Sequence, residues 1–422
     1  MSTPAEVASR LAVRLRAALR DPEVRLAQAG LAERIAFLAG GISVGLVPGE
    51  SAWSVLEPAP ADCSVVLEAD ADVWDRALDA APPPGFHSVT ALRRSGHLAV
   101  AGDPLAFARA LHLLERVLEL VRAPSGPTPV QPARTGVERD LGQIEGRYHR
   151  VSTGAETATL YAERAGAGIP VLMLHTAGAD SRQYQALLAD VGLAHRWRMH
   201  AFDLPMHGRS APPDGWDGGR WVLTQALYLG WCAAFLEQVV RAPAVIVGCS
   251  MGAGMALVLA AERPHLVEAV VALEAPFRAR GRRSSYLTHA AVNASAHNPS
   301  YVRGLMSPAA AGSARRAATW IYGQGALGVY EGDLAFYEEF DGASVAPRID
   351  GARCPVTFFT GAYDYSAPPA EAERLAALIP GSTVDVMPGL GHFPMIEDPD
   401  RLLAHLTPVL DRLAGRLGRG TP

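Results

Sequence analysis

The feature that most restricts the fold is a series of short, almost continuously apolar runs in the last two thirds of the chain. Each run is followed by a turn and usually by a helical pattern. Strands that are apolar along their length and separated by helices are typical of a parallel sheet covered on both faces. In such a sheet, functional side chains follow the carboxyl ends of the strands. The predicted strands are Val171–His175, His200–Leu204, Val245–Val247, Val267–Leu273 and Val356–Thr360.

A proline-rich segment separates this region from a shorter N-terminal part. The prolines within Ala123–Pro132 lack the N–H that a helix or a central strand needs, so the segment is expected to be an extended linker. A chain of 422 residues also exceeds what one core usually supports. We therefore expect an N-terminal domain over 1–122, a linker over 123–136 and a C-terminal α/β domain over 137–422.

The N-terminal part has the pattern of a small α+β domain. An aspartate at 103 stands where it would cap the last helix. Helices are expected over Glu6–Arg20, Pro22–Ala39, Asp70–Leu78 and Asp103–Leu120, and apolar strands over Ile42–Val47, Cys63–Leu67 and Leu98–Ala101.

Composition excludes several classes of function. Hydrophobic residues make up 49% and charged residues 19%, as in a packed globular protein, and the net charge of -5 gives no electrostatic reason to expect nucleic acid. The four cysteines are scattered without metal-site spacing. The N-terminal residues do not resemble a signal peptide and no apolar run has the length of a membrane span. These features favour a soluble cytoplasmic protein.

A G-x-S-x-G match marks the strongest candidate nucleophile. Gly248-Cys-Ser250-Met-Gly252 follows a predicted strand and opens a helical run of small residues. That context holds a serine in a tight turn, with the N-terminal end of a helix directed at a developing negative charge. A second match, Gly41-Ile-Ser43-Val-Gly45, follows a predicted helix and precedes an extended segment, so it is interpreted as accidental.

A histidine and an aspartate that follow the serine complete a predicted catalytic triad. His392 is presented by a glycine loop before a helix that begins near Pro399, and its imidazole would be the general base. Asp364 follows the strand that ends at Gly361 and would orient that base. Glu274, at the end of the preceding strand, is the competing acid. His175 and His207 lie in other turns, where structural hydrogen bonding is expected.

Together these motifs resemble the α/β-hydrolase superfamily, from about Arg147 to the C-terminus. Phe202-Asp203-Leu-Pro-Met-His-Gly208-Arg-Ser210 matches the D-x-P-x-H-G-x-S turn of that family. Leu174-His175-Thr-Ala-Gly178 stands in the place of its His-Gly oxyanion loop. The resemblance implies that the backbone N–H groups of Met251 and of Ala177 or Thr176 bind the oxyanion. Thr176 stands where glycine is common, so both loop residues remain candidates.

The resemblance also implies a cap over the site, at about 277–350, with helices over Ala310–Tyr322 and Leu334–Phe340. Aromatic residues of the cap would line an apolar acyl or aryl pocket, or would simply pack the cap onto the sheet. These residues are Trp320, Tyr322, Tyr330, Phe336 and Tyr337. Four cap arginines could contact an anionic group of a substrate, but a solvated charged face is the favoured interpretation; they are Arg278, Arg280, Arg282 and Arg283.

The N-terminal part is similar in its order of elements to SCP2-like sterol-carrier domains, over about Leu19 to Val121. The segment Leu98-Ala-Val-Ala-Gly-Asp103, which leads into the last helix, carries this resemblance. It implies an apolar pocket for a lipid-like ligand. The alternative is a structural or dimerisation module, which would make the protein a homo-oligomer.

These expectations define three hypotheses about function. The first is a serine hydrolase that cleaves an ester of a small apolar or aromatic substrate through an acyl-enzyme, with no metal or organic cofactor. The second keeps the triad but cleaves an amide, thioester, lactone or carbon–carbon bond. The third is a lipid-binding carrier that acts through the N-terminal domain.

Overall fold

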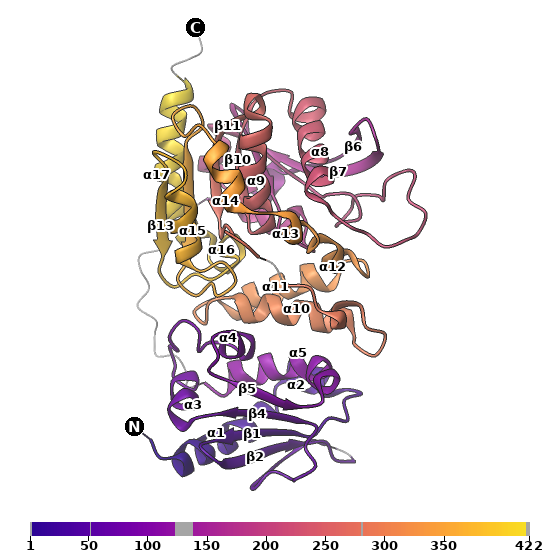
Figure 1. Cartoon of the computed structure of the whole chain (residues 1–422), viewed down its shortest axis with the longest axis vertical. Coiled ribbons are helices and arrows are strands. Elements are labelled where there is room, and N and C mark those ends of the chain that lie inside the picture. Colours follow the sequence, from indigo (N-terminus) through magenta and orange to yellow (C-terminus); the bar gives the residue numbers. More distant parts are fainter. Residues whose placement is uncertain (1, 51, 123–137, 280–281, 419–422) are drawn as a thin grey trace. The chain divides into compact units, whose positions relative to one another are not determined.

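The predicted apolar runs lie side by side in an eight-stranded sheet in the computed structural model (Figure 1). The structure describes residues 2–50, 52–122, 138–279 and 282–418, so the predicted linker falls outside the described residues. The strand order is β13-β12-β11-β10-β8-β9-β7-β6. The strands are β6 (Glu145–Ser152), β7 (Thr157–Ala165), β8 (Ile169–Leu174), β9 (Trp197–Phe202), β10 (Ala244–Cys249), β11 (Val267–Leu273), β12 (Val356–Gly361) and β13 (Thr383–Met387).

The sheet is parallel from β13 to β9 and antiparallel at the β7 and β6 edge. Every residue of β10 is buried, as expected for a strand with neighbours on both sides and helices on its faces. Residues 145–148 of β6, in contrast, are exposed. The carboxyl ends of β8, β10, β11 and β12 therefore meet at one edge in the middle of the sheet. The α/β fold class is confirmed.

Helices connect the strands and cover the sheet. The helix after β10 packs on β8, β10 and β11. The helices of this part are α6 (Gln185–Leu188), α7 (Val191–Ala194), α8 (Gln225–Phe235), α9 (Met251–Glu262), α11 (Gly312–Gly323), α12 (Val329–Asp333), α13 (Phe336–Glu339), α14 (Gly342–Val345), α15 (Pro369–Ala376), α16 (Pro394–Glu397) and α17 (Pro399–Leu417). Shorter turns of helix are η1 (Leu141–Gln143), η2 (Ser181–Tyr184), η3 (Leu236–Val240), η4 (Pro264–Leu266) and η6 (Ala346–Arg348). None of the described helices is both long and apolar enough to cross a membrane.

The N-terminal part forms a separate five-stranded sheet with its own apolar core. Its strand order is β3-β2-β1-β4-β5, and only β1 and β4 are parallel. The strands are β1 (Ile35–Ala39), β2 (Ile42–Val47), β3 (Ser54–Leu56), β4 (Val65–Ala69) and β5 (Ala99–Gly102). The helices are α1 (Pro4–Ala18), α2 (Pro22–Gln28), α3 (Ala71–Ala77), α4 (Val89–Arg94) and α5 (Pro104–Leu120), and the Asp103 carboxylate caps α5 through the Leu105 N–H.

The helix expected over Pro22–Ala39 is wrong in its second half. The helix ends at Gln28, shortly before Gly30, which has a left-handed backbone with φ of 79°. Residues 35–39 instead form β1, whose pairing with β2 and β4 overrides its local pattern. Gly40 and Gly41, both with positive φ, close the β1–β2 hairpin. Ser43 therefore lies within β2, where its hydroxyl accepts a hydrogen bond from the Ala59 N–H.

Residues 285–309 belong to the N-terminal unit, although the sequence analysis assigned them to the cap. By their internal contacts, the described residues divide into one unit of 2–122 with 285–309 and another of 138–284 with 310–418. The inserted segment contains η5 (Ser285–Thr288) and α10 (Ala294–Leu305). The helix α10 packs on α5 and α4. The chain thus leaves the C-terminal unit at the start of the cap and returns to it before α11.

Buried charges and one glycine fix α10 on the N-terminal unit. The guanidinium of Arg303 is 1% exposed and pairs with Glu119 at 2.7 Å and with Glu23 at 3.3 Å. A Cβ at Gly304 would lie 2.2 Å from Thr90 Oγ1, so only glycine permits this approach. Isolated buried charges are costly, whereas a guanidinium with two carboxylates is compensated. The interface of α10 is therefore specific in both shape and charge.

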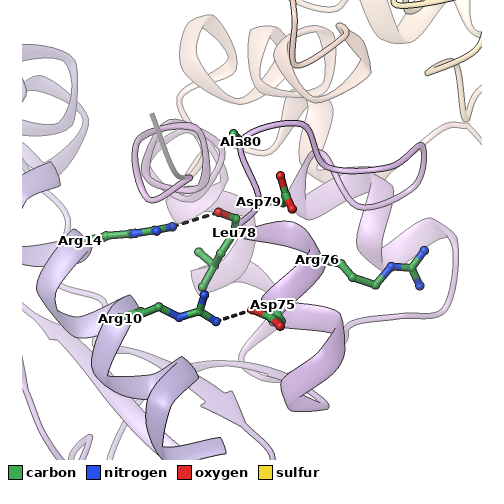
Figure 2. A pocket seen from close by; sticks show the side chains of 7 residues that line it. All are labelled: Arg10, Arg14, Asp75, Arg76, Leu78, Asp79 and Ala80. Atoms are coloured by element: carbon green, nitrogen blue, oxygen red, sulfur yellow. Dashed lines mark hydrogen bonds and ion pairs between the residues drawn. The ribbon is translucent and has the colours of Figure 1, made fainter. Parts of the chain in front are cut away.

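A pocket of about 280 Å³ in the N-terminal unit is lined by charged side chains (Figure 2). Arg10 pairs with Asp75 across it, and Arg14 donates to the Leu78 carbonyl at 2.9 Å. A lipid tail would have to displace or bury these charges, which is unfavourable. This pocket is therefore not the apolar cavity that the SCP2-like resemblance implies.

Beneath α10, the N-terminal unit buries the carboxyl group of Glu115. It accepts hydrogen bonds from the Val89 N–H at 3.1 Å and from the Thr90 N–H and Oγ1 at 2.9 and 2.8 Å. Burial raises the pKa of Glu115 to about 7, although these hydrogen bonds act in the opposite direction. Because folding raises this pKa, Glu115 is more fully protonated in the folded unit than in the unfolded chain between about pH 4.5 and 7.

The N-terminal unit should therefore lose stability as the pH rises through neutrality. The contribution of protonated Glu115 to the free energy of unfolding is fully present below pH 4.5 and lost as the pH passes about 7. It amounts to roughly 3 kcal/mol in total. Hydrogen exchange of α4 and α5 amides, corrected for intrinsic rates, measures it between pH 5 and 8. Glu115→Gln should flatten this dependence, whereas the control Glu68→Gln, at an exposed position of β4, should leave it unchanged. An unaltered slope in the Glu115 variant would contradict the assignment.

Candidate active site

The predicted nucleophile lies in a strained turn between β10 and α9. Ser250 has φ of 54° and ψ of −110°, a conformation that a non-glycine residue adopts only when its surroundings enforce it. Its N–H donates to the Leu273 carbonyl at 2.9 Å. A Cβ at Gly248 would lie 2.1 Å from the Gly252 carbonyl oxygen, and one at Gly252 would lie 2.3 Å from the Leu174 carbonyl oxygen. Both glycines of the motif are therefore required by backbone contact.

The predicted base and acid are hydrogen-bonded to each other. His392, in the loop between β13 and α16, has its Nδ1 2.6 Å from Oδ2 of Asp364, which follows β12. The other carboxylate oxygen, Oδ1, accepts from the Ser366 and Ala367 N–H groups at 2.7 and 3.1 Å. The Cys249 thiol donates to the His392 carbonyl at 3.3 Å, which holds the histidine loop beside the nucleophile turn. Ser250, Asp364 and His392 are all buried.

The hydroxyl of Ser250 is hydrogen-bonded to the cap. Its Oγ lies 2.8 Å from the hydroxyl oxygen of Tyr337, on α13. No hydrogen bond joins Ser250 to His392 among the described residues. Contacts between a nucleophile and its base are often loose before substrate binds. The structure thus joins two members of the predicted triad directly and adds a tyrosine at the third.

Glu274, the competing acid, lies behind Asp364. It also has a positive φ, of 52°, and its carboxyl group accepts from the Gly361 N–H at 2.9 Å. Burial, together with the neighbouring charge of Asp364, raises the pKa of Glu274 well above its usual value, so it is protonated and hydrogen-bonded to Asp364. Asp364 itself is ionised: burial disfavours its charge, but His392 and the hydrogen bond from Glu274 hold its pKa at about 2.

These three side chains could also hold a cation, since one ligand atom of each lies within 4.8 Å of the others. Nδ1 of His392, however, is occupied by its bond with Asp364, and a metal there would displace that proton. The hydrogen bonds therefore favour an acid–base pair over a metal site.

In the loop after β8, the two candidate oxyanion donors, Thr176 and Ala177, differ in their backbone hydrogen bonds. The Thr176 N–H donates to Oε1 of Gln183 at 3.0 Å, and the Gly178 N–H donates to Oδ2 of Asp333 at 2.7 Å. Within the described residues, the N–H of Ala177 has no hydrogen-bond acceptor. The first N–H groups of a helix also lack intrahelical partners, which applies to Met251 at the start of α9. Ala177 and Met251 are thus the amides available for an oxyanion.

His175 and His207 have the structural roles expected of them. His175 Nδ1 donates to the Thr176 carbonyl at 2.9 Å, and its Nε2 accepts from the Leu204 N–H at 3.3 Å. Burial and the charge of His207 lower the pKa of His175, so its ring is neutral. His207 Nε2 donates to Asp333 Oδ2 at 2.7 Å. Burial alone would lower the pKa of His207, but the Asp333 carboxylate raises it.

Asp333, on α12 of the cap, was not singled out from the sequence. Its buried carboxylate accepts from Gly178, from His207 and from the Trp221 indole at 2.9 Å. One side chain therefore connects the oxyanion loop to the cap. A single acidic residue in an irregular helical segment carries no sequence pattern that would have revealed it.

The cap aromatics differ in burial and in the residues that they contact. Trp320 is 66% exposed, because the buried face of α11 carries Ala318, Ile321 and Tyr322 instead. Phe336 packs against Gly254 of α9, as in the alternative of simple cap packing. The Tyr322 hydroxyl is hydrogen-bonded to Thr176 Oγ1, and the ring of Tyr330 contacts Gly178.

Arg282 also differs from expectation. Its guanidinium carbon lies 4.5 Å from the centre of the Tyr337 ring, and it donates to the Ser366 carbonyl at 2.8 Å. It is therefore half-buried beside the site. Arg278 and Arg283 do form ion pairs nearer the surface, with Asp341 and Glu331, and Arg280 lies outside the described residues.

A family model described as "Alpha/beta hydrolase family" matches residues 171–405, more than half of the chain. The chain belongs to the alpha/beta hydrolase family. It is therefore an enzyme of the α/β-hydrolase type, as predicted.

Relatives of this hydrolase resemble it over about two thirds of its length. The acetyltransferase component of the acetoin cleaving system of Cupriavidus necator is 29% identical over 279 residues, which cover 61% of this chain and 64% of that protein. Similar solved structures include a putative aryl esterase from Burkholderia cenocepacia, with a TM-score of 0.55 and 17% identity, covering 64% of this chain and 100% of that one. An esterase from Thermogutta terrifontis has a TM-score of 0.52 and 20% identity, covering 64% and 99%. The enol-lactonase from Burkholderia xenovorans has a TM-score of 0.52 and 17% identity, covering 63% and 100%.

Replacing Glu274 tests whether it acts as a protonated donor. Glu274→Gln keeps a donor for Asp364 and an acceptor for Gly361, so hydrolysis of 4-nitrophenyl acetate should stay within about threefold of the parent rate. Glu274→Ala removes both, and kcat should fall roughly 10- to 100-fold, as expected for loss of a charged hydrogen bond. Equal losses in the two variants would rule out this role.

The Asp333–His207 pair should stabilise the hydrolase in a pH-dependent manner. Breaking a buried ion pair from one side typically costs about 3–5 kcal/mol, so Asp333→Asn should lower the free energy of unfolding by roughly that amount. Folding raises the pKa of His207. The ion pair therefore contributes fully to the free energy of unfolding below about pH 6.5, and its contribution is lost as the pH rises through the pKa that His207 has in the folded protein. Urea unfolding at pH 6 and pH 9 should show the larger penalty at pH 6. A penalty that grows with pH would contradict this pairing.

Proposed function

We propose that this hydrolase is a serine hydrolase that cleaves a carboxylic ester or related acyl bond of a small apolar or aromatic substrate. The supporting observation is the 2.6 Å hydrogen bond between His392 and Asp364. The loop that carries His392 also accepts a hydrogen bond from Cys249, the residue before the strained Ser250. A histidine held in this way has a defined tautomer, with Nδ1 protonated and Nε2 left as the base. The ionised, buried Asp364 stabilises the imidazolium that would form.

The proposed reaction proceeds through an acyl-enzyme. Ser250 Oγ attacks the substrate carbonyl while His392 takes its proton, and the carbonyl oxygen gains negative charge. His392 then gives the proton to the leaving group. A water molecule, deprotonated by the same histidine, releases the acyl group from Ser250. Each step needs the same imidazole, so loss of His392 should prevent both halves of the reaction.

The N–H groups of Ala177 and Met251 would bind the oxyanion. Both belong to backbone that is fixed by other contacts, so the donors are oriented before the charge develops. Loss of one such donor typically costs about 3 kcal/mol of transition-state stabilisation. Thr176, whose N–H already donates to Gln183, instead supports the loop.

Aromatic side chains around the site favour an apolar or aromatic acyl group. The Tyr322 ring lies 6.0 Å from that of Tyr330 and 5.8 Å from that of Phe393. The names of the similar structures, an esterase, an aryl esterase and an enol-lactonase, agree with ester or lactone cleavage. Amide, thioester and carbon–carbon bonds remain alternatives on the same triad, and the relative named as an acetyltransferase adds acyl transfer to another acceptor.

The other expectations from the sequence stay predictions. They are a lipid-like ligand in the N-terminal unit, a homo-oligomer and a cytoplasmic location.

A fluorophosphonate probe followed by peptide mapping tests the nucleophile. The label should appear on Ser250, and Ser250→Ala and His392→Ala should abolish both labelling and aryl-ester hydrolysis. Ser43→Ala is a matched control, because Ser43 has the same G-x-S-x-G pattern within a strand of the N-terminal unit. Labelling of another serine, or full activity of Ser250→Ala, would overturn the proposal.

A further inference from the structure

The contact between Tyr337 and Ser250 is unexplained by the triad. The two hydroxyl oxygens are 2.8 Å apart, and Tyr337 is 1% exposed. In the proposed reaction Ser250 gives its proton to His392, and from that point only the tyrosine can donate in the hydrogen bond between the two hydroxyls. The cap therefore supplies a hydrogen-bond donor at the reacting oxygen.

Arg282 holds this tyrosine in place. Its guanidinium lies over the Tyr337 ring, at 4.5 Å from the ring centre. The same guanidinium donates to the carbonyl of Ser366, whose N–H is bound by Asp364. The turn that carries the catalytic acid thus also anchors the group that stacks on the tyrosine. Burial raises the pKa of Tyr337, although the charge of Arg282 and the hydrogen bond with Ser250 act in the opposite direction, so the hydroxyl keeps its proton.

The Tyr337 hydroxyl lies 2.8 Å from the oxygen that attacks the substrate in the proposed reaction. In a tetrahedral intermediate, the oxyanion is only two bonds away from Ser250 Oγ. A donor 2.8 Å from Oγ is therefore within reach of the developing charge.

We propose that Tyr337 is a catalytic residue that completes the oxyanion hole from the cap, beside Ala177 and Met251, with Arg282 as its positioning residue. This inference rests on the proposed function. As Oγ bonds to the carbonyl carbon, the π electrons move to the carbonyl oxygen and the serine proton moves to His392. Tyr337 keeps its proton and shifts its hydrogen bond from Oγ to the oxyanion.

Tyr337→Phe measures this contribution, with Tyr228→Phe as a matched control. The Tyr228 hydroxyl is also buried, on α8, and makes no hydrogen bond with any described residue. Loss of an oxyanion donor typically lowers kcat by about 10²- to 10³-fold, so Tyr337→Phe should show that loss with KM within about threefold, and Tyr228→Phe should match the parent. An unchanged kcat in Tyr337→Phe would overturn the inference.

A transition-state analogue separates this role from a purely structural one. An aryl trifluoromethyl ketone forms a tetrahedral adduct with an active-site serine, so its affinity should fall in Tyr337→Phe by the same factor as kcat. The kcat loss should also be equal for 4-nitrophenyl and methyl esters of one acid. A loss that is much larger for the methyl ester would instead place the donor at the leaving oxygen and contradict the oxyanion role.

A double-variant cycle tests Arg282. Arg282→Ala should lower kcat less than Tyr337→Phe does, and should cause no further loss in the Tyr337→Phe background. Additive losses would refute the positioning role. Fluorophosphonate labelling and Ser250→Ala separate failure of this inference from failure of the proposed function. If Ser250→Ala is inactive but Tyr337→Phe has normal activity, only the role of Tyr337 is refuted. If Ser250→Ala is active, the proposed function itself is refuted.

Discussion

The site is built around one buried negative charge, that of Asp364. A carboxylate removed from water is strongly destabilised unless hydrogen bonds replace its hydration. Here the replacements are the imidazole of His392, two backbone N–H groups and the protonated carboxyl group of Glu274. Two neighbouring carboxyl groups in a dry environment cannot both ionise at neutral pH. Their separation into one charged and one neutral group is what allows Asp364 to serve the histidine.

The cap contributes structure to the site as well as covering it. Three of its side chains reach the catalytic edge of the sheet: Tyr322 at Thr176, Asp333 at Gly178 and Tyr337 at Ser250. Tyr322 holds the proposed oxyanion loop through the side chain of Thr176, and Asp333 holds it through the backbone N–H of Gly178. Among the residues that the structure describes, the Ala177 N–H between them has no hydrogen-bond acceptor, whereas the Thr176 N–H donates to Gln183 and the Gly178 N–H donates to Asp333. The cap therefore holds the residues on both sides of this N–H, through the Thr176 side chain and the Gly178 backbone.

Much of this arrangement could be predicted from the sequence, for identifiable reasons. Strands such as Ala244–Cys249 are apolar along their whole length, and backbone contact requires both glycines around Ser250. Residues whose role depends on a distant partner were harder to predict. Asp333 and Arg282 have no local pattern, and the interpretation of Arg282 as solvated was wrong because a charge gives no sign of the ring beneath it. The prediction of a helix over residues 35–39 was wrong because pairing with β2 and β4, and not local preference, decides the conformation of this segment.

The insertion of α10 changes what can be removed from this protein. A chain that lacked the first 122 residues would keep α10, together with the guanidinium of Arg303 and the glycine that fits against Thr90. That helix would then present to water a face shaped for an absent partner, and its buried cation would have no counter-charge. Residues 2–122 and the inserted segment 285–309 are thus interdependent, and a change in one restricts which changes the other can accept.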